Sequence, residues 1–186
     1  LKFTNVTWRF KEMAEIKDSG SRREFGTGAH RDSNDDKGRM DLVPLSIAAR
    51  MVETDEAPDM VMQLIEDFKN DNDTKKLIQA LRESINYISD FDSVETIILD
   101  VSHHYKAGAL KYGENNWKLG MGVNNYIDSG IRHYIKARRG DTDEPHHSAF
   151  AWNLMCAIWT VENIPGSKYK EVIELEPGIA YNKEEQ

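Results

Sequence analysis

The feature that most constrains the fold is the spacing of the apolar residues, which recur every three or four positions through most of the chain after residue 41. This spacing puts them on one face of an α-helix. Alternation that would indicate a strand is confined to residues 172–175. The pattern therefore predicts an all-α bundle of about six helices, at residues 41–53, 58–68, 74–88, 93–113, 124–138 and 145–164.

The ends of these helices carry recognisable signals. Thr74 and Ser93 stand where an N-cap is needed, and Gly140 follows the fifth helix as a C-terminal glycine does. Residues 1–40 lack the periodicity and are rich in glycine and arginine, so we expect an irregular or binding segment there. The 186 residues suffice for one domain with its own core, and we expect the tail after residue 177 to fray.

Composition excludes several classes of protein. With 24 basic and 32 acidic residues the net charge is -8, which opposes binding to nucleic acid. No apolar stretch approaches the roughly 20 residues of a membrane-spanning helix, and residues 1–10 lack an export signal. The single cysteine, Cys156, lies in an apolar run and forms no intramolecular disulfide, so we expect a cytoplasmic protein. Long amphipathic helices also predict a homo-oligomer.

Groups of polar residues interrupt the apolar helices at spacings that place side chains on a shared face. They are Asp100 with His103 and His104, Asp128 with Arg132, Ser129 with His133, and His146 with Asn153, the last pair preceded by Asp141, Asp143 and Glu144.

Each group has two interpretations. A histidine here is a metal ligand or a structural residue, and Asp128 forms a surface ion pair with Arg132 or points into the bundle, where it needs a partner or a metal. The acids before His146 complement a helix dipole, or they bind a hard cation such as Mg²⁺ or Mn²⁺. The residues alone leave these alternatives open.

Two common phosphate chemistries are not supported. The sequence has no His-Asp dipeptide of the metal phosphohydrolases and no glycine-rich stretch that ends in Gly-Lys-Ser/Thr. The apolar surroundings of Cys156 favour packing over nucleophilic attack.

Several short motifs point to a protein family more specifically than the chemistry of their residues points to a reaction. In sequence order they are residues 25–32 (FGTGAHRD), 37–39 (KGR), 41–44 (DLVP), 108–113 (GALKYG) with Asn116, Trp117 and Gly120, then Asp128-Ser129, Arg132-His133, Glu144, His146 and Trp152-Asn153. In order and spacing the chain resembles the phage and prophage dATP/dGTP diphosphohydrolase family, which is similar to the all-α nucleotide pyrophosphohydrolases. The resemblance covers residues 22–53 and 94–160, so we interpret residues 54–93 as a helical insertion.

This resemblance implies metal-dependent hydrolysis of a purine deoxynucleoside triphosphate, dATP or dGTP, to the monophosphate and pyrophosphate. It implies catalytic roles for Asp128, Glu144 and His146, and Mg²⁺ (or Mn²⁺) held by Asp128, Glu144 and Asp100. The implied substrate-binding residues are Arg31, Lys37 and Lys111 for phosphate, Tyr112, Asn116 and Trp117 for the base, and also Arg132, His133 and Asn153.

A second hypothesis is a nucleotide-binding or interaction module without turnover. The classical all-α pyrophosphohydrolases have two glutamates three residues apart on one helix, where this chain has Asp100 and His103. Individual residues also have structural explanations, such as a core position for Trp117.

Overall fold

The computed structural model describes residues 22–32 and 59–169. Its elements are β1 (Arg22–Glu24), β2 (His30–Asp32), α2 (Met60–Asp71), α3 (Thr74–Glu83), the 3-10 helix η2 (Ser84–Asn86), α4 (Val94–Tyr112), the 3-10 helix η3 (Asn116–Leu119), α5 (Val123–Arg139) and α6 (His146–Asn163). The five α-helices confirm the all-α expectation. The expected helix at 41–53, the stretch 172–175 and the tail after 177 lie outside the described residues.

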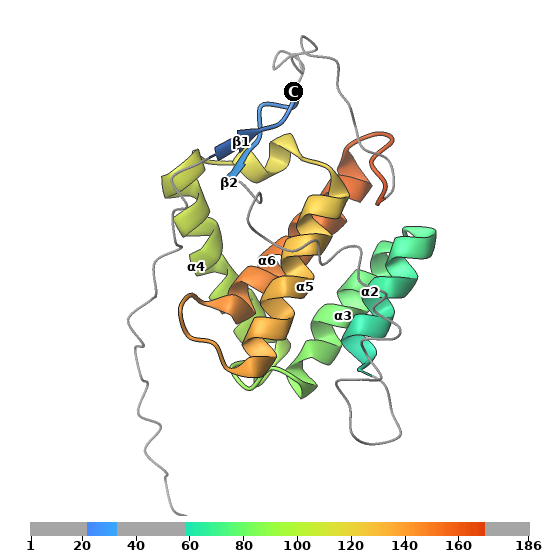
Figure 1. Cartoon of the computed structure of the whole chain (residues 1–186), viewed down its shortest axis with the longest axis vertical. Coiled ribbons are helices and arrows are strands. Elements are labelled where there is room, and N and C mark those ends of the chain that lie inside the picture. Colours follow the sequence, from blue (N-terminus) through green and yellow to red (C-terminus); the bar gives the residue numbers. More distant parts are fainter. Residues whose placement is uncertain (1–21, 33–58, 170–186) are drawn as a thin grey trace, which may run out of the picture.

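The helices α5 and α6 form the centre of the fold (Figure 1). A short turn joins them, and α4 packs against one side of α6 while α3 packs against the other, with α2 beside α3. Their apolar stripes face inward and bury Tyr126, Ile131, Tyr134, Phe150 and Leu154 completely or nearly so. The periodicity of the sequence thus fixes which face of each helix forms the core.

The helix ends follow local rules, with one correction. Ser93 accepts a hydrogen bond from the Thr96 amide at 3.2 Å, and Gly140 ends α5 in the left-handed region with φ 79°. The expected cap at Thr74 is wrong, because the preceding Asp73 accepts from the Lys75 amide at 3.1 Å and is the N-cap of α3. Aspartate and threonine are both good caps, so adjacent candidates cannot be separated by residue type.

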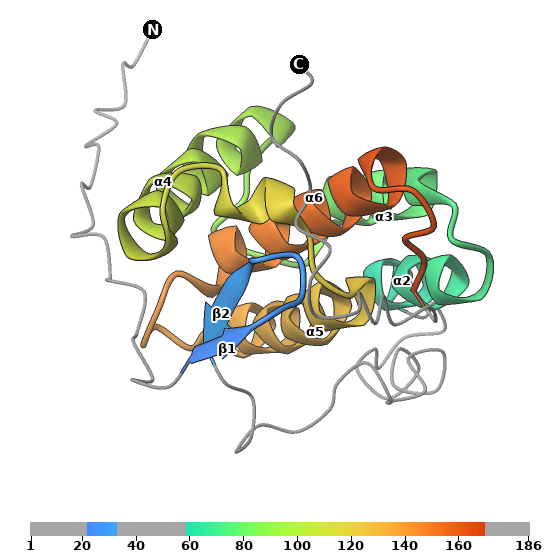
Figure 2. The same ribbon diagram turned by 90° about the horizontal axis from the view of Figure 1, so that it is seen from above.

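Part of the N-terminal segment forms an antiparallel hairpin of β1 and β2. Within its loop the Phe25 amide donates to the Ala29 carbonyl at 2.9 Å, and Gly28 adopts φ 80°, which favours glycine. The hairpin lies on the side of α5 and α6 away from α2 and α3 (Figure 2). Thr27 fastens it to the end of η3 by donating to the Gly120 carbonyl at 2.6 Å.

Candidate functional site

The site begins with the close approach of α5 and α6. At Gly130 an added Cβ would lie 2.8 Å from Leu154 Cδ1 and 3.5 Å from Asn153 Cβ, so the absence of a side chain lets the two helices come together. Asp128, Ser129 and Asn153 are all buried at this crossing. Polar groups removed from water here require partners.

Asp128 points into the bundle and is 2% exposed. Arg132, one turn later on α5, donates from Nη2 to its Oδ2 at 2.7 Å. The sequence left open whether Asp128 forms an intrahelical ion pair or faces inward, and the structure has both. A charge-assisted hydrogen bond of this length compensates for part of the desolvation of the carboxylate.

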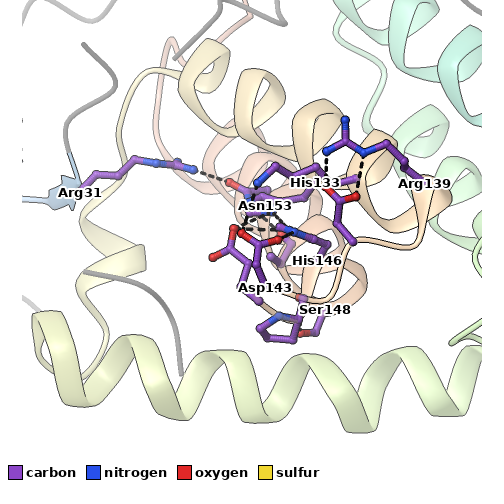
Figure 3. Close-up of polar contacts among 12 residues, drawn as sticks. Arg31, His133, Arg139, Asp143, His146, Ser148 and Asn153 are labelled. Carbon is purple, nitrogen blue, oxygen red and sulfur yellow. Dashed lines mark hydrogen bonds and ion pairs between the residues drawn. The ribbon is translucent and has the colours of Figure 1, made fainter. Parts of the chain in front are cut away.

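A cluster of histidines and acids lies where α5 passes the start of α6 (Figure 3). His133 Nδ1 is 2.9 Å from His146 Nδ1, and Glu144 Oε1 lies 3.6 Å and 3.4 Å from these two atoms. On the far edge of the His146 ring, Nε2 is 2.8 Å from Asp143 Oδ1. Burial, followed by the neighbouring His146 ring, holds the pKa of His133 well below its usual value, which favours the neutral imidazole.

Arg31 reaches into this region from β2 (Figure 3). Its Nη2 donates to Asn153 Oδ1 at 2.8 Å, while Asn153 Nδ2 donates to the Ala149 carbonyl at 2.8 Å. The guanidinium also lies over the Tyr126 ring, 5.8 Å from its centroid. Burial lowers the pKa of Arg31 from its ordinary value, although nearby acidic groups oppose the shift. The hairpin thereby places a cation between the two central helices.

The residue before Arg31 joins β2 to η3. The Asn116 side chain accepts from the His30 amide at 3.2 Å and donates to the His30 carbonyl at 3.3 Å. One strand therefore links the α5–α6 crossing to the segment that follows α4.

That segment borders an open cleft of about 290 Å³. Aromatic side chains line it together with the amide of Asn116 and the backbone at Gly108 and Gly113; they are Tyr105, Tyr112, Trp117 and Trp152. Tyr105 packs edge-on against Trp117 and Trp152, with centroid distances of 5.3 Å and 6.2 Å. Trp152 packs on His104 at 5.5 Å and on Tyr126 of α5 at 6.1 Å. Because Arg31 lies over the same Tyr126 ring, the cleft and the polar crossing share one wall.

A family model described as dATP/dGTP diphosphohydrolase, N-terminal, matches residues 70–170, more than half of the chain. The chain belongs to this family. No curated protein and no solved structure matches it significantly. The match to the dATP/dGTP diphosphohydrolase model begins at residue 70, near the end of α2. This residue lies inside the segment 54–93 that we interpreted as an insertion, so the division of the domain remains a prediction. No helix among the described residues is both long and apolar enough to cross a bilayer.

Against this family background, the structure gathers most of the predicted site residues into two adjacent groups. One group contains Arg31, Asp128, Arg132, His133, Glu144, His146 and Asn153, and the other contains Tyr112, Asn116 and Trp117. Lys111 lies beside the second group, with Nζ 5.2 Å from the Tyr112 centroid. Lys37 lies outside the described residues.

Neither Asp100 nor Asp128 belongs, with Glu144, to a group of described residues that could hold an ion. Asp100 instead contacts His147. Its Oδ2 lies 3.4 Å from His147 Nε2, and Asp90 lies 3.3 Å from the other nitrogen of that ring. Among the described residues, two groups could hold an ion with all ligand atoms within 4.8 Å of one another: His133 with Glu144 and His146, and Asp141 with Asp143 and His146. Which acids bind a metal remains a prediction.

Sequence reasoning gave no site role to Tyr105, and it left His104 open between a metal ligand and a structural residue. Tyr105 precedes Tyr112 by seven residues, two helical turns on one face, and this spacing could have revealed the aromatic wall. His104 belongs to neither group of described residues that could hold an ion; burial lowers its pKa to about 4, and its Nδ1 has no hydrogen-bond partner among the described residues. Burial raises the pKa of Cys156 to about 12, which agrees with a packing role.

Proposed function

We propose that the protein hydrolyses a purine deoxynucleoside triphosphate, dATP or dGTP, to the monophosphate and pyrophosphate in the cytoplasm. The observation that carries the proposal is the pair of sites joined by β2, an aromatic cleft beside a partly buried cluster of acids, imidazoles and arginines. Membership of the dATP/dGTP diphosphohydrolase family supports the substrate class.

The cleft suits a nucleobase. Tyr112 and Trp117 offer aromatic faces for stacking, and the Asn116 amide offers a donor and an acceptor. Ligand pockets usually measure about 300–1,000 Å³, so a cleft of about 290 Å³ fits the base and sugar better than the whole nucleotide. The phosphates would then extend along β2 toward Arg31.

Cations at the other end of this path suit the triphosphate. Arg31 and Arg132 are held by Asn153 and Asp128, and Lys111 lies near the cleft. Fixed cations stabilise the charge that develops on phosphate oxygens without reorganising during the reaction. We propose the same electrostatic role for Lys37, which the sequence resemblance implies as a phosphate-binding residue.

The donor set partly fits Mg²⁺ or Mn²⁺. Asp128 on α5 and Glu144 in the turn before α6 supply the carboxylate oxygens that such ions prefer, whereas Asp100 lies with His147. The ion would neutralise phosphate charge and lower the pKa of an attacking water. We propose Asp128 and Glu144 as its ligands and His146, whose ring is oriented by Asp143, as a further catalytic residue beside Glu144.

The alternative is a nucleotide-binding module without turnover. The contact of Asp100 with His147 and the ion pair of Asp128 with Arg132 favour it, because both carboxylates already have partners. This alternative expects a purine deoxynucleotide to raise the melting temperature of the protein while no product forms.

The test is pyrophosphate release from each of the four deoxynucleoside triphosphates with Mg²⁺ or Mn²⁺. We expect turnover of dATP or dGTP, and a loss of about 100-fold or more in Asp128→Asn and Glu144→Gln. Glu95→Gln is the matched control, because Glu95 is an exposed acid on α4, and it should retain the activity. Inertness toward both purine nucleotides would refute the proposal.

A further inference from the structure

We propose that His133, Glu144 and His146 form a binding site for a divalent transition-metal ion of the zinc or cobalt type. Their three donor atoms face one another, with His133 Nδ1 2.9 Å from His146 Nδ1 and Glu144 Oε1 3.6 Å and 3.4 Å from these nitrogens. The proposal rests on the geometry of these side chains and does not depend on the nucleotide chemistry proposed above.

The distances fit a metal ion. Zinc–nitrogen and zinc–carboxylate bonds of about 2.0–2.1 Å in a tetrahedral site set ligand atoms about 3.3–3.4 Å apart. The point equidistant from the three donor atoms lies about 1.9 Å from each, so an ion slightly out of their plane reaches all three with little movement. Two imidazoles and one carboxylate leave a fourth position open, as catalytic zinc sites do.

Asp143 supplies a second, independent observation. An ionised carboxylate only accepts hydrogen bonds, so the 2.8 Å contact of Asp143 Oδ1 with His146 Nε2 puts the ring proton on Nε2. The lone pair of His146 is then on Nδ1, which points at His133 and Glu144. A carboxylate on the distal ring nitrogen is the usual means of orienting a metal-binding histidine.

The backbone holds the three ligands on well-packed elements. His133 lies on α5, His146 begins α6, and Glu144 lies in the short turn between them. The His146 side chain is 1% exposed, whereas those of His133 and Glu144 are each 18% exposed. An ion therefore has a route to the site from the side of these two residues.

The second candidate group, on the other edge of His146, is less suitable. Its acids already face cations, because Arg139 forms a two-point ion pair with Asp141 and Lys136 Nζ lies 3.7 Å from Asp143. Around His146, the structure therefore favours a metal at Nδ1 and the orienting acid at Nε2.

The ligand types select the ion. Imidazole nitrogens favour zinc, cobalt(II) and related ions, whereas Mg²⁺ prefers oxygen ligands and an octahedral site. The inference thus assigns Glu144, which the proposed function gives to Mg²⁺, to a transition-metal ion together with His133 and His146, so that ion would take the place of Mg²⁺ at Glu144.

The experiment is a titration of the metal-free full chain with Co²⁺ in the absence of nucleotide, followed by visible absorption. We expect the ligand-field bands of tetrahedral Co²⁺, one ion per chain, displaced by Zn²⁺ and retained in excess Mg²⁺. His133→Gln and Glu144→Gln should each weaken binding at least about tenfold, and Asp143→Asn by about 10–100-fold. The exposed His103→Gln on α4 is the matched control and should bind normally.

Absence of these bands, displacement by Mg²⁺, or normal binding by both His133→Gln and Glu144→Gln would overturn the proposal. The last two variants change partly exposed side chains, and circular dichroism would verify that each is folded before the titration. A chain that binds Co²⁺ in this way but hydrolyses no nucleotide would uphold the metal site and refute only the proposed function.

Discussion

Asp59 offers a direct test of how α2 joins the rest of the bundle. Its side chain is fully buried and accepts from the Met62 amide at 3.1 Å, from the Tyr134 hydroxyl at 2.7 Å and from the Arg138 guanidinium. The residue is thus both the N-cap of α2 and the partner of two side chains on α5. Asp59→Ala would remove all three interactions and leave Arg138 without this carboxylate.

Breaking a buried ion pair from one side usually destabilises a protein by about 3–5 kcal/mol, whereas loss of an N-cap alone costs about 1 kcal/mol. We therefore expect Asp59→Ala to lower the free energy of unfolding by about 3–5 kcal/mol. With a urea dependence of about 2 kcal/mol per M, the unfolding midpoint should fall by about 2 M. Urea titration followed by tryptophan fluorescence measures this shift.

Asp73→Ala is the matched control, because Asp73 caps α3 in the same way but is a solvent-exposed contact with the Lys75 amide. Its midpoint should fall by about 0.5 M. Equal shifts in the two variants would refute the reasoning, since they would mean that the links from Asp59 to Tyr134 and Arg138 contribute nothing.

Three further predictions concern titration, the cleft and assembly. The lowered pKa of His104, about 4, means that its neutral form stabilises the fold above pH 6.5 and that this contribution is lost as the pH falls from 6.5 to 4. Over this range, wild type should lose about 3 kcal/mol more unfolding free energy than His104→Gln, and equal losses would contradict the assignment. Trp117→Leu should raise KM for the purine nucleotide about tenfold with little change in kcat, and an unchanged KM would leave Trp117 a core residue. Leu110 is 82% exposed on α4, and we expect the predicted homo-oligomer to cover it. Leu110→Glu should then dissociate the oligomer in sedimentation experiments without changing stability by more than about 0.5 kcal/mol, and a monomeric wild type would contradict that expectation.

The sequence predicted the helices well because each carries its own apolar stripe and end signals. The inward direction of Asp128 was not predictable, since an aspartate four residues before an arginine fits a surface helix equally well. The close approach of the helices at Gly130, near Asp128, depends on Leu154 and Asn153 of α6. The spacing of residues along α5 alone therefore cannot predict it.

The hairpin was likewise missed as secondary structure. Each strand has only three residues, too few for an alternating pattern, and the chain positions that fasten it, Asn116 and Gly120, are about 90 residues away. The family resemblance identified residues around Arg31, but the contact of Arg31 with Asn153 needs the folded chain. Long-range polar contacts of this kind are the part of a site that periodicity cannot predict.

The central claim is that the cleft and the α5–α6 cluster together cleave the bond between the α and β phosphates. Phosphorus NMR of dGTP or dATP incubated with the full chain and Mg²⁺ or Mn²⁺ tests it most directly, because it resolves every phosphate product in one spectrum. The account predicts equal amounts of deoxynucleoside monophosphate and pyrophosphate. Signals of the diphosphate with orthophosphate, of inorganic triphosphate, or of unreacted nucleotide alone would contradict it.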